Sequence, residues 1–305
     1  MTLVVFGPTA TGKTDLAIEL AKKFNGELIS ADSRQVYKSL DIGTGKVSFE
    51  STVQKKKNFW IVDGVKIYGF DLINPGEKFS ASDFHKFALS KIAQIKKDNK
   101  LPIVVGGSGF YIKSIIIPFE TLGIEQNPKL RTQLEKLSKK ELLEMLKRLD
   151  PKKTESLNDS DRNNPRRLVR AIEVAKSKSK KQKTVSLDYK MIGLSAANNF
   201  LYNRADKWLE TRLNSGLIEE IENLIKNCTD PKWLVSLGLE YRWITNYLLG
   251  KISKETAVER LRGDIHDFIR RQKTFFLQFP EIKKFDIQKK NYQKAIMDYV
   301  NDLKI

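Results

Sequence analysis

An eight-residue segment near the N-terminus, Gly7–Thr14, constrains the fold more than any other part of the chain. It reads GPTATGKT, fits the pattern G-x-x-x-x-G-K-[ST], and lies between an apolar run, Leu3–Phe6, and a helical pattern, Asp15–Ala21. A strand, a glycine-bounded loop and a helix in that order are typical of a phosphate-binding loop. The backbone N–H groups of such a loop and the N-terminus of its helix bind phosphate oxygens. The segment therefore predicts a polyphosphate ligand in an α/β protein.

Side chains of this loop have separate expected roles. We expect Lys13 to lie along the bridging phosphate and the Thr14 hydroxyl to bind Mg²⁺, while backbone groups hold the other phosphate oxygens. A glycine-rich turn without a ligand is the structural alternative. The expected diphosphate-binding residues are Gly7, Pro8, Thr9, Ala10, Thr11, Gly12, Lys13 and Thr14.

The charge balance indicates a polyanionic partner. The 305 residues include 55 Lys and Arg but only 37 Asp and Glu, which gives a net charge of +18. Such a surplus favours nucleic acid over a membrane, although a lysine-rich proteome would account for part of it. The single cysteine, Cys228, excludes an internal disulfide and a cysteine-based zinc finger. His85 and His266 are far apart in the sequence, which argues against a histidine-centred metal site.

The chain shows no pattern of export or membrane insertion. No apolar stretch reaches the length of a transmembrane helix, and no signal-peptide pattern precedes the first expected strand. We therefore expect a cytoplasmic protein without membrane contact, and a monomer.

A second apolar strand, Glu27–Ala31, is followed directly by Asp32. Ligands of open α/β sheets lie at the carboxyl ends of the strands, so Asp32 is expected to face the phosphate loop. A carboxylate there can bind Mg²⁺ or take a proton from a bound nucleophile; a helix N-cap is the structural alternative. The polar, glycine-rich segment Leu40–Lys46 is predicted to be a substrate-facing loop.

A third strand end is expected to join the same site. Residues 59–62 and 66–70 predict a hairpin around Asp63-Gly64, and Ser82–Lys97 predicts a helix. The apolar run Pro102–Val105 then leads into Gly106–Tyr111, where two glycines allow the backbone to approach a ligand and Ser108 offers a hydroxyl.

The middle of the chain predicts an inserted all-helical subdomain. Helical patterns occur at Asn127–Leu137, Lys139–Leu149 and Pro165–Ala175, and Met191–Ser195 predicts a strand that returns to the sheet. The predicted fold is a P-loop NTPase-like α/β core, with a parallel sheet flanked by helices, plus this insertion. The predicted boundaries are 1–118 for the first part of the core, 119–188 for the insertion, and 189–305 for the return strand and the C-terminal helices.

Two basic clusters are candidate nucleic-acid contacts. Arg166 and Arg170 share a helix face, with Arg167 about 100° away. A solvated helix face is the usual fate of such residues, but the basic surplus favours contact with a nucleic-acid backbone. In Arg270–Phe276 cations and aromatic residues alternate, which suits RNA contacts or a buried aromatic stripe beside a solvated basic one.

Two kinds of chemistry fit these residues. A phosphate loop usually serves phosphoryl transfer, and Asp32 would then be both metal ligand and base. Alternatively, the loop holds a diphosphate that leaves as a unit, and transfer occurs at a carbon atom such as that of an allylic diphosphate. The residues alone leave both possibilities open.

Over nearly its whole length the chain resembles the tRNA dimethylallyltransferases, also called tRNA isopentenyltransferases. Their phosphate loop, GPTASGKT, is similar to Gly7–Thr14, and Ile29–Lys46 has every fixed residue of I-S-x-D-S-x-x-x-Y-[KR]-x-[LM]-D-I-G-T-x-K. Their motif G-G-T-x-x-Y is similar to Gly106–Tyr111, with Ser108 for threonine. N-D-x-x-R-[LIV]-x-R-A-[LI]-E-V is matched from its arginine onward by Arg167–Val174, and R-R-Q-x-T-W-[FL] is similar to Arg270–Phe276, with phenylalanine for tryptophan.

The resemblance implies transfer of a dimethylallyl group from dimethylallyl diphosphate to N6 of the adenine immediately 3′ of the anticodon, with release of diphosphate. It implies that Asp32 is the general base, that Ser108 contacts the adenine or the transition state, and that Mg²⁺ binds near Thr14. One of Arg204, Lys207 and Arg212 would also contact the diphosphate. The residues that it places against the tRNA anticodon stem-loop are Asp32, Ser33, Arg34, Gln35, Arg131, Arg166, Arg167, Arg170, Arg270, Arg271 and Gln272.

Three alternatives share parts of this pattern. An adenylate isopentenyltransferase would use a free nucleotide, which does not require a basic insertion. A small P-loop kinase would bind and consume ATP. A nucleotide-switched RNA-binding protein would need no base at Asp32.

Overall fold

The computed structural model describes residues 1–117, 121–122, 124, 126–177, 187–279 and 281–303. The chain divides into two compact units. The larger unit comprises Met1–Ile117 and Ser186–Ile305, and the smaller comprises Pro118–Val185. The predicted boundary between residues 118 and 119 lies outside the described residues.

The larger unit is built on one mixed sheet, which has eight strands among the described residues, in the order β3-β4-β5-β2-β6-β1-β7-β8. From β5 to β8 all neighbours are parallel, and only β3-β4 and β4-β5 are antiparallel. The strands are β1 (Thr2–Phe6), β2 (Gly26–Ser30), β3 (Val53–Lys55), β4 (Trp60–Val62), β5 (Val65–Tyr68), β6 (Leu101–Gly106), β7 (Tyr189–Ser195) and β8 (Ile282–Asp286). The predicted α/β core with a parallel sheet flanked by helices is confirmed.

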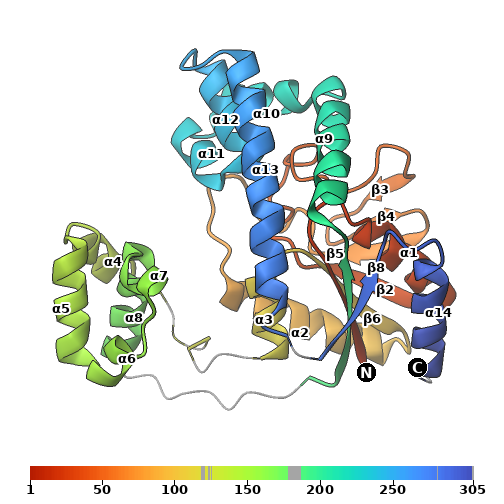
Figure 1. Ribbon diagram of the computed structural model, residues 1–305, viewed down its shortest axis with the longest axis horizontal. Coiled ribbons are helices and arrows are strands. Elements are labelled where there is room, and N and C mark those ends of the chain that lie inside the picture. Colours follow the sequence, from red (N-terminus) through yellow and green to blue (C-terminus); the bar gives the residue numbers. More distant parts are fainter. Residues whose placement is uncertain (118–120, 123, 125, 178–186, 280, 304–305) are drawn as a thin grey trace. The chain divides into compact units, whose positions relative to one another are not determined.

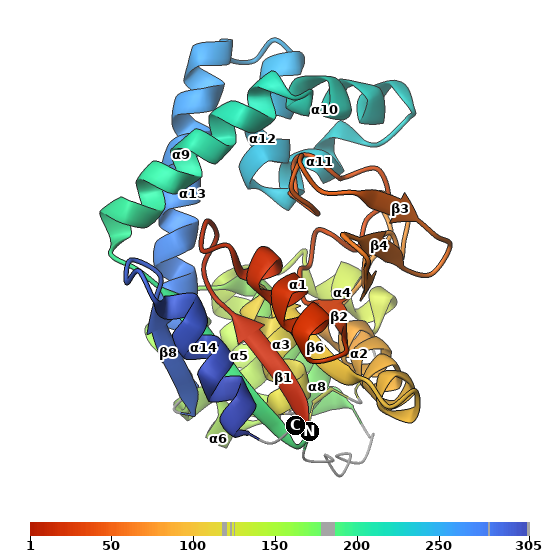
Figure 2. The same ribbon diagram turned by 90° about the vertical axis from the view of Figure 1, so that its right-hand side faces the viewer.

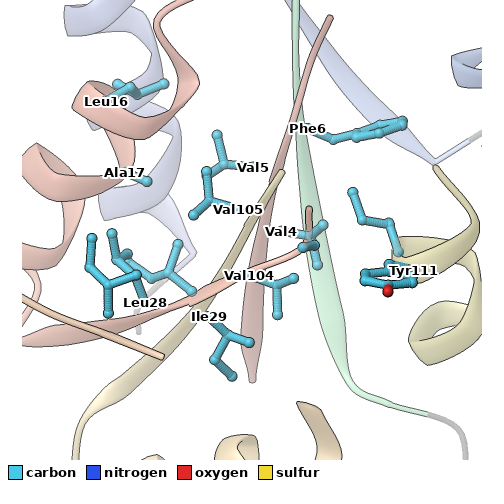
Figure 3. Close-up of a cluster of buried hydrophobic side chains, with 14 of the residues drawn as sticks. Val4, Val5, Phe6, Leu16, Ala17, Leu28, Ile29, Val104, Val105 and Tyr111 are labelled. Atoms are coloured by element: carbon cyan, nitrogen blue, oxygen red, sulfur yellow. The ribbon is translucent and has the colours of Figure 1, made fainter. Parts of the chain in front are cut away.

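The central strands are buried on both faces, as their continuous apolar sequences require. All residues of β1 and β6 are buried, and Val4 and Val5 lie in register with Val104 and Val105. Successive residues of a strand point to opposite faces. Figure 3 accordingly shows Val5 and Val105 on the side of helix α1 (Lys13–Lys23), and Val4 and Val104 on the side of helix α3 (Gly109–Ile116).

Helices α1 and α3 follow the loops at the ends of β1 and β6, and α2 (Ala81–Lys97) follows the longer loop after β5. Helix α2 begins at a capping box in which the Ser80 hydroxyl accepts from the Asp83 N–H and the Asp83 carboxylate accepts from the Ser80 N–H. Helix α14 (Tyr292–Asp302) packs near β8. Figures 1 and 2 show the sheet enclosed by these helices.

A block of five helices follows β7 and stands beyond the carboxyl ends of the strands (Figure 1). Its members are α9 (Asn198–Asn214), α10 (Leu217–Lys226), α11 (Pro231–Leu237), α12 (Leu239–Leu248) and α13 (Lys254–Phe276). The long helix α13 extends from this block back to the sheet, where Phe276 packs on Phe6 of β1. The block therefore forms one piece with the sheet.

Within the smaller unit the described residues form short helices around a core of their own. The helices are α4 (Pro128–Leu134), α5 (Lys139–Leu149), α6 (Pro151–Glu155), α7 (Asp159–Arg162) and α8 (Pro165–Lys176). Three of them begin with proline and are capped by the side chains of Asn127, Asp150 and Asn164, the residue types favoured at these positions. The core comprises Leu134, Leu142, Leu146, Leu168, Val169 and Ile172.

Several elements differ from the sequence-based expectation. The patterns did not predict β3, α3, α6, α7, α11, β8 or α14. Strands β3 and β8 lie at the two edges of the sheet and are largely exposed, so they lack the apolar pattern that identified the central strands.

Candidate active site

One cavity of about 830 Å³ lies at the carboxyl ends of β1, β6 and β2. These three strands are neighbours in the sheet, in the order β2-β6-β1. Their loops therefore open on the same space, which is the usual ligand site of such a sheet. Helices α9 and α13 close its other side, with Arg204, Trp208, Phe268 and Phe275 among the lining residues. All lining residues belong to the larger unit.

The phosphate loop has a conformation fixed by its own residues. Ala10 and Gly12 have φ angles of 68° and 74°, which turns the chain before α1. The Thr11 hydroxyl donates to the carbonyl oxygen of Pro8 at 2.8 Å and closes the loop. A Cβ atom on Gly7 would lie 2.9 Å from the Thr11 hydroxyl oxygen, so the tight loop requires glycine there.

Lys13 and Thr14 form the first turn of α1, and both line the cavity. The Lys13 ammonium lies 3.4 Å from the Pro8 carbonyl oxygen, to which it donates. Burial lowers the pKa of Lys13, while the negative charges of Asp32 and Asp15 act in the opposite direction. A cation, a free helix N-terminus and backbone N–H groups thus face one space, which is the arrangement that binds phosphate.

The structure distinguishes the three cations of α9. The Arg204 Nε donates to the carbonyl oxygen of Ala10 at 2.8 Å, so this side chain lies against the phosphate loop. Arg212 is buried, where it donates to the Gly43 carbonyl oxygen and to the Glu240 carboxylate, at 2.8 Å each. Lys207 lines the cavity. Arg204 is therefore the member of this group best placed to reach a bound diphosphate.

Asp32 and Ser108 come from adjacent strand ends and lie on the cavity wall. Asp32 Oδ1 accepts a hydrogen bond from the Arg34 N–H at 2.9 Å, which orients the carboxylate. Ser108 Oγ accepts from the Ser33 N–H at 2.9 Å, and the Ser108 N–H donates to the Ala31 carbonyl oxygen at 3.1 Å. The serine that replaces threonine in the motif thus joins the loops after β2 and β6.

Gln35, which was predicted to contact tRNA, is also part of an internal network. Its Oε1 accepts from the Ser30 hydroxyl at 2.7 Å, and its Nε2 donates to the carbonyl oxygens of Thr44 and Gly45, at 3.3 and 3.1 Å. Gln35 therefore connects strand β2 to the loop 40–46, while it lines the cavity.

The predicted substrate-facing loop, Leu40–Lys46, lines the cavity with residues 43–46, but its lysine points inward. Lys46 is fully buried, and its ammonium donates to Asp41 at 2.6 Å, to Asp71 at 2.5 Å and to the Tyr37 carbonyl oxygen. For Lys46 the expectation of substrate contact is wrong, because the two carboxylates compensate its charge inside the protein.

Glu220, which the sequence analysis did not identify, binds the backbone of the loop 40–46. Glu220, on α10, accepts hydrogen bonds from the N–H groups of Asp41, Ile42 and Gly43 and from the Tyr241 hydroxyl, at 2.6–3.0 Å. No local sequence pattern around Glu220 predicts that its carboxylate bonds to a segment 177 residues away.

On the far side of the cavity, α13 brings Arg271 and Gln272 to its wall. Arg271 is exposed and lies over the ring of Phe268, as does Arg34 from the loop after β2. Gln272 is only 6% exposed, and its amide is bonded to backbone groups. Its amide is thus engaged within the protein, and its predicted contact with tRNA stays a prediction. Arg270 pairs with Asp267 and donates to the Tyr202 hydroxyl.

The arginines predicted on the smaller unit are mostly engaged within it. Arg131 and Arg170 both donate to the buried carboxylate of Glu173, at 2.9–3.0 Å and 2.5 Å, and Arg167 pairs with Asp161. Arg166 is exposed and forms no ion pair among the described residues. Burial alone would raise the pKa of Glu173, but the hydrogen bonds from Arg131, Arg170 and the Asn127 N–H lower it to about 2.

A family model described as IPP transferase matches residues 35–279. The tRNA dimethylallyltransferase of Acetivibrio thermocellus is 37% identical over 293 residues, which cover 92% of this chain and 90% of that protein.

The chain belongs to the IPP transferase family.

Other members have similar extent and fold. The tRNA dimethylallyltransferase of Alkaliphilus oremlandii is 35% identical, and the alignment covers 96% of this IPP transferase and 93% of that protein. The crystal structure of a tRNA delta(2)-isopentenylpyrophosphate transferase from Staphylococcus epidermidis superposes with a TM-score of 0.69 at 31% identity and covers 99% of both chains. The P-loop NTPase-like fold predicted for this IPP transferase is therefore confirmed.

Each helix among the described residues is too short or too polar to span a lipid bilayer. The same residues contain no group of three His, Cys, Asp or Glu side chains arranged to hold a metal ion.

Proposed function

We propose that this protein transfers a dimethylallyl group from dimethylallyl diphosphate to N6 of the adenine immediately 3′ of the anticodon in tRNA, with release of diphosphate. One observation carries the proposal: the phosphate loop and Asp32 face the same cavity in a member of the IPP transferase family. The names of its relatives, tRNA dimethylallyltransferases, supply the substrate class.

The diphosphate belongs at the phosphate loop. Backbone N–H groups between Gly7 and Thr14, the Lys13 ammonium and the N-terminus of α1 stabilise the negative charge that grows on the leaving group. The Arg204 guanidinium, fixed through its Nε to Ala10, extends toward the loop and adds a further cation. We expect Arg204→Ala to raise the KM for dimethylallyl diphosphate by about tenfold, since a hydrogen bond to a charged group is worth ~1.5–3 kcal/mol.

A Mg²⁺ ion fits the residues of this site. The Thr14 hydroxyl lies on the cavity wall, and the cavity has no carboxylate cluster among its described residues, so the donors suit an ion held mainly by diphosphate oxygens and water. If bound there, Mg²⁺ would neutralise charge on the departing diphosphate.

Asp32 acts at the nucleophile. The adenine N6 forms a bond to C1 of the dimethylallyl group while the bond from C1 to the diphosphate oxygen breaks, and the diphosphate takes the electron pair. Asp32 accepts the proton that N6 loses. The Arg34 N–H bonds to Oδ1 of Asp32, so Oδ2 remains available to accept this proton. Ser108, bonded to Ser33, stands beside the same position and contacts the adenine.

The anticodon stem-loop is expected to meet the rim of the cavity with Ser33, Arg34 and Arg271, since their side chains line it. Arg166 and Arg167 supply cations on the smaller unit. Arg131 and Arg170 support that unit through Glu173 and reach tRNA only with their remaining N–H groups. The location in the cytoplasm, where tRNA is found, and a monomeric state are parts of this proposal.

The testing experiment uses radiolabelled dimethylallyl diphosphate, Mg²⁺ and an unmodified anticodon stem-loop whose anticodon ends in adenine. Label in the RNA supports the proposal, and its loss in Asp32→Ala assigns the base. Label on free adenylate alone would point to an adenylate isopentenyltransferase. ATP consumption without transfer would indicate a kinase, and RNA binding switched by nucleotide without any transfer would indicate a regulatory RNA-binding protein.

A further inference from the structure

Gln272 bonds directly to two loops of the cavity that are 98 residues apart in the chain. Its Oε1 accepts a hydrogen bond from the Thr9 N–H at 2.9 Å, and its Nε2 donates to the Gly107 carbonyl oxygen at 3.1 Å. Thr9 belongs to the phosphate loop, and Gly107 immediately precedes Ser108. Helix α13 thus holds, through one side-chain amide, the loops on both sides of the site.

The bond to Gly107 is buried, and the bond to Thr9 is partly buried. The side chain is 6% exposed, and a Cβ atom added to Gly107 would collide with Gln272 Nε2. Glycine at position 107 therefore leaves the space that the amide fills. The N–H groups of a phosphate loop usually point at the ligand, whereas that of Thr9 is taken by Gln272.

We propose that Gln272 is a positioning residue, which sets the distance between the diphosphate at the phosphate loop and the adenine beside Ser108. This inference rests on the proposed function. Transfer to N6 requires the attacking nitrogen and C1 to lie within about 3–3.5 Å of each other, and a misplacement of about 1 Å costs on the order of 10²-fold in rate. Freeing the two loops from each other therefore slows the chemical step and leaves the binding of each substrate almost intact.

The bond to Gly107 can be broken alone or together with the bond to Thr9. Gln272→Glu keeps an acceptor for the Thr9 N–H but replaces the donor to Gly107 with a second acceptor. Gln272→Met removes both bonds while keeping a side chain of similar length. The matched control is Gln278→Glu, six residues further along the chain, where the exposed amide oxygen accepts from the Lys113 ammonium at 3.1 Å.

We would measure the single-turnover transfer rate at saturating substrates and, separately, the Kd of dimethylallyl diphosphate and of the anticodon stem-loop. We expect both Gln272 variants to lower the rate about 10- to 100-fold with less than threefold change in either Kd, and Gln278→Glu to match the wild type. An unchanged rate with a weakened Kd for RNA alone would overturn the proposal and assign Gln272 to tRNA contact.

A double-mutant cycle with Gly107→Ala gives a second test that does not depend on one variant. The added methyl group displaces the Gln272 amide, so Gly107→Ala alone should slow transfer, whereas in a Gln272→Ala background, where no side-chain atom beyond Cβ remains to collide, it should cost less than threefold. Fully additive effects would overturn the proposal. If the wild-type protein itself transfers no label to RNA, the proposed function fails, and this outcome is distinct from a failure of the role of Gln272.

Discussion

At the edge of the cavity, the carboxylate of Asp32 accepts a hydrogen bond from the Arg34 N–H and forms no ion pair among the described residues. On helix α8, the carboxylate of Glu173 is surrounded by the guanidinium groups of Arg131 and Arg170 and by the Asn127 N–H. One acid is left with capacity for a further partner, and the other has its bonding capacity used inside the protein. The contrast separates the acid that we propose for the chemistry from one that holds the smaller unit together.

The strongest test of the contrast is removal of each acid in turn. Asp32→Ala should lower the transfer rate by about 10²–10⁴-fold, because the N6 proton loses its acceptor. Its thermal midpoint should stay close to that of the wild type, since the carboxylate forms no ion pair among the described residues. A steady-state assay with labelled dimethylallyl diphosphate measures the first quantity and calorimetry the second. A large fall in stability with little loss of rate would reverse the roles assigned to the two acids.

Glu173→Gln should have the opposite profile. It leaves Arg131 and Arg170 without their carboxylate and should destabilise the smaller unit by about 2–4 kcal/mol, at the lower side of a broken buried pair because both arginines are partly exposed. Hydrogen exchange in the intact protein is the measurement: amides of α4 and α8 should lose protection while those of β1 keep it. Equal loss in β1 would mean that Glu173 stabilises more than its own unit.

Acid pH should weaken the smaller unit by the same route. The pKa of Glu173 is about 2 in the folded protein and 4.5 in the unfolded chain, so its contribution to stability is present above pH 4.5 and disappears as the pH falls toward 2. The loss is on the order of 3 kcal/mol. Protection of α8 amides between pH 5 and pH 3 measures it, and Glu173→Gln should show a flatter dependence in that range. A parallel dependence in the two proteins would exclude Glu173 as the titrating group.

The smallest expected effect is on RNA binding by Arg166, which forms no ion pair among the described residues. Arg166→Ala should weaken binding of the anticodon stem-loop about two- to fivefold and reduce its dependence on salt by about one phosphate contact. Arg148→Ala, which removes another cation of the smaller unit from helix α5, is the control. Titrations at several salt concentrations distinguish the two variants. Identical slopes for both would show only a general effect of net charge.

The sequence predicted those parts of the site whose position is set by the residues next to them in the chain. The phosphate loop, Asp32 and Ser108 each follow a buried strand, and strand ends of a parallel sheet meet at one edge. Short-range spacing was therefore enough to bring them together.

Long-range polar contacts were beyond the reach of the sequence. Glu220 bonds to a loop 177–179 residues away, and Gln272 to groups 165 and 263 residues away. The residue type determines which groups a side chain can bond to, but tertiary packing determines which of them it contacts. For the same reason Arg131 and Arg170 carried the same signal as Arg166, although a buried carboxylate occupies the first two.

The two edge strands of the sheet have a consequence for the protein in concentrated solution. Edge strands expose unpaired N–H and C=O groups that can join the sheet of another molecule. Here β3 presents Gln54 and Lys55 to water, and β8 presents Lys283 and Lys284. Lysines on both edges repel a second copy that approaches strand to strand, and the net charge of +18 adds to this repulsion. We expect this protection against aggregation to weaken as salt screens the lysines, so solutions of the protein should become turbid sooner on heating at high ionic strength than at low.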